Sequence, residues 1–116
     1  MIEYKIGERE YEFNCKLRTC LKIKTKFNKN YMEIINEIDK MDVNELINLL
    51  YCGLDKEKVD EKEFRDYVLD TCGMAELYDH VTWFVMQLQY PGLSEDEIEK
   101  KLLEKKLKQK KLQEQM

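Results

Sequence analysis

Four short motifs, each a small polar residue followed three positions later by glutamate, most constrain how this chain folds. They are Asn30 with Glu33, Asp42 with Glu45, Asp60 with Glu63, and Ser94 with Glu97. In such a motif the first side chain accepts a hydrogen bond from an unpaired backbone N–H of the first helical turn. Each motif therefore predicts the start of a helix. The last one follows Pro91 and Gly92, which end any helix before it.

Apolar side chains recur at helical spacing through the same part of the chain. The four sets are Tyr31, Ile34, Ile35 and Ile38; Val43, Leu46, Ile47, Leu50 and Leu54; Phe64, Tyr67, Val68 and Cys72; and Leu77, Val81, Phe84, Val85 and Leu88. Each set forms one apolar stripe on a helix, which predicts four amphipathic helices. Gly53 and Gly73 stand where the second and third stripes finish, so we expect them to end those helices.

The first 15 residues instead alternate between apolar and polar side chains, as a half-buried strand does. Gly7-Glu8-Arg9-Glu10 separates the segment from Ile2 to Ile6 from the alternating Tyr11, Phe13 and Cys15. Two such segments joined by a short glycine-containing loop predict a β-hairpin. The expected fold class is therefore mainly α (α+β). It consists of an N-terminal β-hairpin followed by about five amphipathic helices, the last of them long and charged.

The segment after the hairpin fits two patterns. Leu17, Leu21, Ile23 and Phe27 continue the period of two, whereas Cys20, Ile23 and Phe27 share one helical face. We expect a helix from about Cys20 to Asn28, with Thr19 as its cap. Six basic residues and no acidic one lie between Lys16 and Lys29. We interpret them as a solvated outer face over Leu21, Ile23 and Phe27, in preference to a contact with nucleic acid or an acidic partner.

Two helices carry apolar side chains that could face a partner. The helix with the fourth apolar stripe also carries large apolar side chains on its opposite side. It is therefore either central to the fold, which we favour, or partly at an interface. Residues 94–116 are predicted to form a charged helix, with a thin apolar stripe, attached to a compact body of residues 1–93. The candidate partner-binding residues are Trp83, Met86, Tyr90, Ile98, Leu102, Leu103 and Leu107. Each of them could equally belong to the core.

Length and charge narrow the class of protein. The 116 residues fit one domain, and the formal net charge is −4. The segment from Lys100 onward holds seven lysines and two glutamates, so an acidic body precedes a basic end. Nucleic-acid-binding proteins present a net basic face, so nucleic acid is not an expected partner.

No apolar run approaches the ~18 residues of a membrane helix, and no leader opens the chain. We expect a soluble cytoplasmic protein without a membrane partner.

Residues that could perform catalysis or bind a metal are sparse. His80 is the single histidine, and Ser94 is already expected to cap a helix. The four cysteines lack the two-residue spacing of a zinc knuckle or a redox motif, so reduced and mostly buried thiols are expected. No glycine-rich loop could hold a phosphate. We predict a non-enzyme with no cofactor and no metal site.

Two segments resemble a known family, the tail assembly chaperones of long-tailed bacteriophages and prophages. The opening MIEYKIGEREYEFNCKLRT, a hairpin leading into a lysine-rich helix, resembles the start of those proteins. The segment DVNELINLLYCGLDKE is similar to the family's helix that ends in an apolar-Tyr-x-Gly-Leu turn. The matching residues here are Leu49, Leu50, Tyr51, Gly53 and Leu54. The helical middle and the charged C-terminal helix also fit, so the resemblance covers most of the chain.

The resemblance implies a non-enzymatic role. Such a chaperone binds the tape measure protein and keeps it soluble in the host cell cytoplasm during tail assembly. It would self-associate and be absent from the mature virion, with the tail tube protein as a further partner. The alternative is a small adaptor or inhibitor module that binds one folded host or phage protein. An adaptor would form a one-to-one complex, whereas a chaperone would bind many sites along an extended client.

Overall fold

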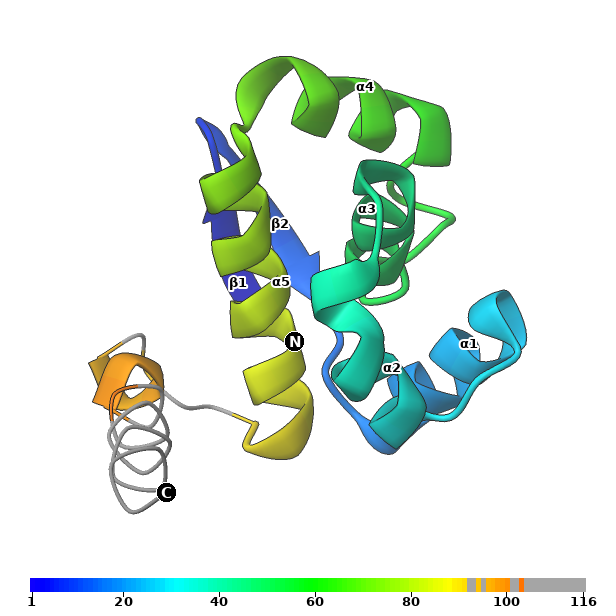
Figure 1. Cartoon of the computed structure of the whole chain (residues 1–116). Coiled ribbons are helices and arrows are strands. Elements are labelled where there is room, and N and C mark those ends of the chain that lie inside the picture. Colours follow the sequence, from blue (N-terminus) through cyan, green and yellow to red (C-terminus); the bar gives the residue numbers. More distant parts are fainter. Residues whose placement is uncertain (92–93, 95, 101–102, 104–116) are drawn as a thin grey trace.

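The computed structural model describes residues 1–91, 94, 96–100 and 103 (Figure 1). Its elements are β1 (Ile2–Ile6), β2 (Arg9–Phe13), α1 (Leu17–Phe27), α2 (Tyr31–Glu37), the 3-10 helix η1 (Ile38–Lys40), α3 (Val43–Tyr51), α4 (Glu61–Thr71) and α5 (Met74–Gln89). Residues 96–100 are also helical. The predicted class, mainly α with a small β part that opens the chain, is confirmed. Within the described residues, no helix combines the length and apolarity needed to cross a membrane.

The hairpin is the predicted antiparallel pair. Ile2 is opposite Phe13, and Ile6 is opposite Arg9, so the connecting loop is two residues long. Gly7, the first of those two residues, has a φ of 61°, a left-handed conformation that glycine adopts without steric cost. Ile6 and Phe13 are fully buried, so one face of the hairpin belongs to the core.

All four predicted helix starts are confirmed by their capping hydrogen bonds. The backbone N–H of Glu45 donates to Asp42 Oδ1 at 2.8 Å, and Glu45 Oε1 accepts in return from the N–H of Asp42 at 3.3 Å. In the other three motifs the N–H of the glutamate donates to the first side chain. Those pairs are Glu33 with Asn30 at 2.9 Å, Glu63 with Asp60 at 3.1 Å, and Glu97 with Ser94 at 3.2 Å.

Helix α1 begins earlier than predicted, at Leu17 rather than about Cys20. Thr19 is not the residue before the helix but lies inside its first turn, where it is buried. Its hydroxyl donates to the Asn14 carbonyl at 2.6 Å and accepts from the N–H of Lys16 at 3.3 Å. Thr19 therefore does form hydrogen bonds with backbone groups at the start of the helix, but it does so from a position inside the helix. Asn28 ends α1 in the left-handed region, with a φ of 56°.

Helix α5 is the central element, because it packs against both the hairpin and α3 (Figure 1). Its buried residues lie around most of its circumference. Trp83 is only 6% exposed, and its ring stacks on Tyr4 at a centroid distance of 3.8 Å. The edge of Phe13 meets the same indole at 5.3 Å. Trp83 is thus a core residue, which is one of the two alternatives that the sequence left open for it.

The apolar-Tyr-x-Gly-Leu turn at the end of α3 is part of the same core. Leu49 and Leu50 are fully buried, and Leu54 is 2% exposed. The Tyr51 hydroxyl donates to the Val59 carbonyl at 2.5 Å, which fixes the loop that follows α3. Gly53 lies against the rings of Phe84 and Phe13. The residues that carry the family resemblance therefore have structural roles here.

Gly73 does follow the end of α4, as predicted, but it also caps the start of α5.

Candidate protein-binding site

A groove runs between α1 and the segment that leads from α3 to α4. Its volume is about 570 Å³. Helix α1 forms one wall, and the other comes from the end of α3, the following loop and the first residue of α4. The lining residues are Arg18, Leu21, Lys22, Thr25, Lys26, Tyr51, Cys52, Leu54, Lys56 and Glu61. We call this set the basic groove.

Three neutral side chains contribute apolar surface to the basic groove. Leu54 and Cys52 are buried at its α3 side, whereas Leu21 is 65% exposed on α1. Burial raises the pKa of the Cys52 thiol to about 11, although Lys26 and Lys22 act in the opposite direction. The thiol is therefore protonated at neutral pH and behaves as a small apolar group.

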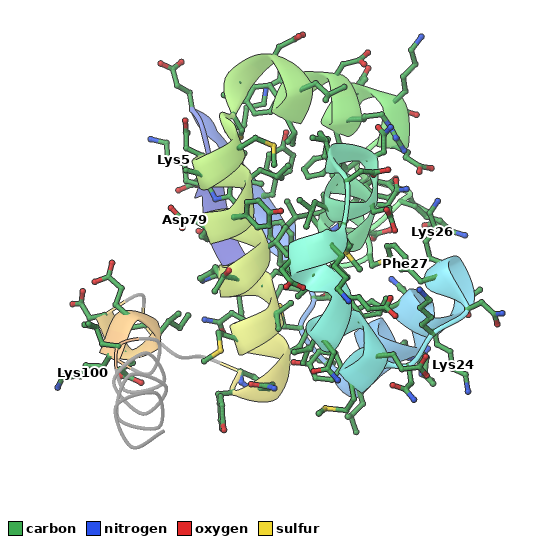
Figure 2. All side chains as sticks on the ribbon, viewed as in Figure 1. Lys5, Lys24, Lys26, Phe27, Asp79 and Lys100 are labelled. Atoms are coloured by element: carbon green, nitrogen blue, oxygen red, sulfur yellow. The ribbon has the colours of Figure 1, made fainter. Side chains whose placement is uncertain are left out.

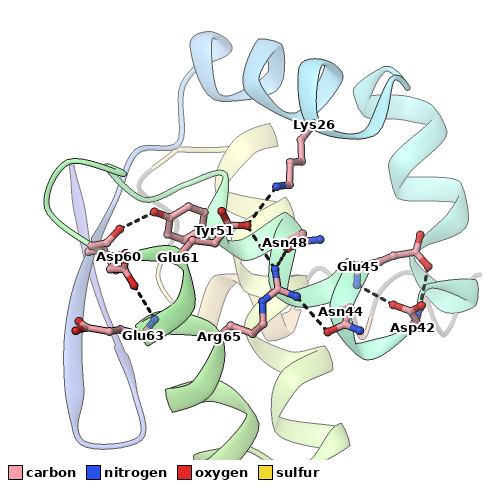
Figure 3. A network of polar contacts seen from close by, with 11 residues as sticks. Lys26, Asp42, Asn44, Glu45, Asn48, Tyr51, Asp60, Glu61, Glu63 and Arg65 are labelled. Atoms are coloured by element: carbon pink, nitrogen blue, oxygen red, sulfur yellow. Dashed lines mark hydrogen bonds and ion pairs between the residues drawn. The ribbon is translucent and has the colours of Figure 1, made fainter.

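Positive charge surrounds this apolar surface. Four of the ten lining residues are basic and one, Glu61, is acidic. Glu61 Oε1 is engaged by two cations, Lys26 Nζ at 3.2 Å and Arg65 Nη2 at 3.4 Å (Figure 3). The single carboxylate of the groove is thus neutralised from within the protein. The groove keeps an excess of positive charge that an acidic partner would complement.

The wall formed by α3 and α4 is held by a network of polar contacts (Figure 3). The guanidinium of Arg65 donates to Asn48 Oδ1 at 2.7 Å and to Asn44 Oδ1 at 3.1 Å. Arg65 is on α4 and both asparagines are on α3, so these bonds fix the two helices against each other. The Lys26–Glu61 ion pair connects α1 to the same network. These contacts indicate a wall that exists before any partner binds.

Helix α1 presents apolar side chains on two opposite sides. Ile23 is fully buried toward the core, and Phe27 is half-buried on the side of α1 that faces the body (Figure 2). Leu17 and Leu21 are one helical turn apart and are 85% and 65% exposed. The interpretation that Leu21 packs beneath the basic residues is wrong. Leu21 and Ile23 are two residues apart, so they cannot share one face of a helix.

The structure does not gather the sequence-predicted binding residues into one site. Met86 is half-buried, Tyr90 at the end of α5 is 47% exposed and Leu103 is 59% exposed. Ile98 is 5% exposed and belongs to the buried set. Leu102 and Leu107 lie outside the described residues. Sequence reasoning instead missed Leu17 and Leu21. The feature of the sequence that could have identified them is that the segment after the hairpin fits both a period of two and a helical period.

Stability at alkaline pH is expected to depend on the buried thiols. Burial raises the pKa of Cys15 to about 12 and that of Cys52 to about 11, from an ordinary value of 9.0. A folded pKa above the unfolded one gives a stabilising contribution that is complete below pH 9 and is lost as the pH rises through the folded pKa. We expect the free energy of unfolding to fall by about 1–2 kcal/mol per thiol between about pH 9 and about pH 10.5.

Urea unfolding followed by circular dichroism across this pH range measures the decline. A Cys15→Ala variant should show a shallower decline than the wild type, because it lacks one of the two strongly shifted thiols. An equally steep decline in that variant would contradict the assignment to Cys15.

No family model, curated protein or solved structure matches this chain.

Proposed function

We propose that this chain is a non-enzymatic tail assembly chaperone of a phage or prophage. Its client is the tape measure protein, which it keeps soluble in the host cell cytoplasm during tail assembly. The chaperone self-associates, contacts the tail tube protein as a further partner and does not remain in the mature virion. The identity of the client rests on the resemblance of the hairpin and of the α3 segment to that family.

The observation that carries the proposal is the position of Leu21, 65% exposed beside a preformed groove with four basic lining residues. Leu17, one helical turn away, is 85% exposed, so the two leucines form a small apolar patch rimmed by charge, the kind of patch that marks a protein-binding surface. The groove complements an amphipathic helix with an apolar stripe flanked by acidic residues. A long helical client could present such stripes repeatedly, so several copies of this chain could bind along it.

The volume of the basic groove, about 570 Å³, also favours the second candidate function. A small adaptor or inhibitor that binds one folded protein needs one defined cavity, and the groove is such a cavity. The two functions differ in stoichiometry. The chaperone binds as several copies per client, whereas the adaptor forms a one-to-one complex.

Co-expression with a candidate tape measure protein, which is long and helical, tests the proposal. We expect the candidate to be soluble only with this chain and to elute with several copies of it. A Leu21→Glu substitution should abolish this effect, because it places an anion and removes apolar surface beside the groove. Added salt should weaken the complex, because it screens the basic residues of the groove.

Met32→Glu is the matched control, because Met32 on α2 is 60% exposed and does not line the groove. Circular dichroism should show the same fold for both variants, and Met32→Glu should keep the client soluble. Equal effects of the two substitutions would place the binding surface elsewhere. Unchanged client solubility with the wild-type chain would favour the adaptor, to be confirmed by a one-to-one complex with a folded partner.

A further inference from the structure

Three side chains that can ligate a metal converge where α4 meets α5, away from the basic groove. Cys72, Glu76 and His80 each offer one ligand atom, and these atoms lie within 4.8 Å of one another. Cys72 and His80 are half-buried, and Glu76 is exposed, so the cluster lies at the surface with two of its members sheltered. None of the polar contacts of the groove includes them.

The break between the two helices is what brings the three side chains together. Cys72 ends α4 with a ψ of 140°, and Gly73 precedes α5 with a ψ of 172°, so both have extended backbones. In one continuous helix, residues 72 and 80 would be about 12 Å apart along the axis. The extended residues turn the chain, so Cys72 approaches Glu76 and His80. Those two occupy neighbouring turns on one face of α5.

We propose that Cys72, Glu76 and His80 form a site for a divalent transition-metal ion, with zinc as the preferred metal. A thiolate, a carboxylate and an imidazole are all zinc ligands, and a water molecule would complete the tetrahedron. Ligand atoms of a tetrahedral zinc site are about 3.3–3.6 Å apart. The three ligand atoms now lie within 4.8 Å of one another, so zinc would draw them closer together. The mixed sulfur, nitrogen and oxygen set disfavours magnesium and calcium, which prefer oxygen ligands.

Two hydrogen bonds hold the proposed ligands in place. Tyr4 Oη lies 2.5 Å from Nδ1 of His80, and Glu76 Oε1 accepts from the N–H of Gly73 at 3.3 Å. Histidine ligands are usually oriented by a bond of this kind to the other ring nitrogen. We therefore assign the metal ligand to Nε2 of His80, an atom that is buried. Tyr4 is itself fixed by its stacking on Trp83.

Metal binding at this site would release a proton. Burial raises the pKa of the Cys72 thiol, and the charge of Glu76 acts in the same direction. The thiol is therefore protonated at neutral pH in the metal-free protein. Formation of the sulfur–zinc bond breaks the S–H bond, and the proton passes to solvent.

Cobalt(II) added to the reduced full-length chain tests the proposal, because a cobalt–thiolate bond gives a charge-transfer absorption in the near ultraviolet. We expect this absorption in the wild type, its displacement by zinc, and its loss in Cys72→Ser. Cys20→Ser is the matched control, since Cys20 is also half-buried but lies on α1. Tyr4→Phe keeps the stacked ring and should lower zinc affinity by about 10–100-fold, the usual effect of losing such an orienting bond.

The single histidine makes a second measurement possible without any variant. Its ring resonances in the NMR spectrum are unambiguous, and zinc should shift them with saturation at one equivalent. Absence of the charge-transfer absorption, its persistence in Cys72→Ser, or histidine resonances that zinc leaves unchanged would each overturn the proposal. These results do not depend on whether the basic groove binds a client.

Discussion

Replacing Trp83 with alanine is expected to lower the free energy of unfolding by about 3–5 kcal/mol. The indole is 6% exposed and is enclosed by two rings of the hairpin, stacked on Tyr4 and in edge contact with Phe13. Truncation removes this contact area and leaves a cavity between the hairpin and α5. Because the hairpin is joined to the body through this contact, the loss should affect the whole domain.

Urea unfolding followed by circular dichroism measures this effect, since the variant lacks the only tryptophan and its fluorescence. Tyr90→Ala is the matched control. Tyr90 belongs to the same set of candidate partner-binding residues as Trp83, but it is 47% exposed. We expect that control to change the stability by no more than about 0.5 kcal/mol. A Trp83→Ala protein with wild-type stability but reduced self-association would instead place Trp83 at an interface.

Replacing Gly53 with alanine should destabilise the protein by about 1–3 kcal/mol. A Cβ atom at this position would lie 2.5 Å from Cε1 of Phe84 and 2.8 Å from Cδ1 of Phe13. Both rings are fully buried, so neither can move away without displacing its own neighbours. The Gly53 carbonyl also accepts from the N–H of Asn14 at 2.7 Å, a bond that joins the end of the hairpin to the end of α3.

Gly73→Ala is the control for this experiment. A Cβ atom there would meet only Glu76 Oε1, at an ordinary contact distance of 3.7 Å. Thermal and urea unfolding of the two variants should therefore differ, with Gly73→Ala close to the wild type. Equal stability of Gly53→Ala and the wild type would show that the two rings can move apart without cost.

The helix starts could be predicted from the sequence because a capping bond joins residues only three positions apart. The side chain of Asp42 and the N–H of Glu45 are brought together by the first turn of the helix itself. No distant part of the chain is needed to make that bond. The start of α1 was harder to predict because Thr19 acts from inside the first turn, a role that the usual capping pattern does not reveal.

Burial on the helices was only partly predictable. Trp83 and Tyr90 are seven residues apart, about two helical turns, yet one is buried and the other exposed. The difference arises because Tyr4 and Phe13 cover Trp83. Periodicity identifies which residues share a face, but it does not say how far along that face another element extends.

The hairpin, the helix starts at the four capping motifs and the apolar stripes could all be inferred from the sequence, because they depend on residues close together in the chain. The exposure of Leu21 beside the basic groove and the burial of Ile23 could not be inferred in this way. The same is true of the approach of Cys72 to His80 across a break between two helices. Both arrangements depend on how separate elements pack, and spacing along the chain constrains positions only within one continuous element.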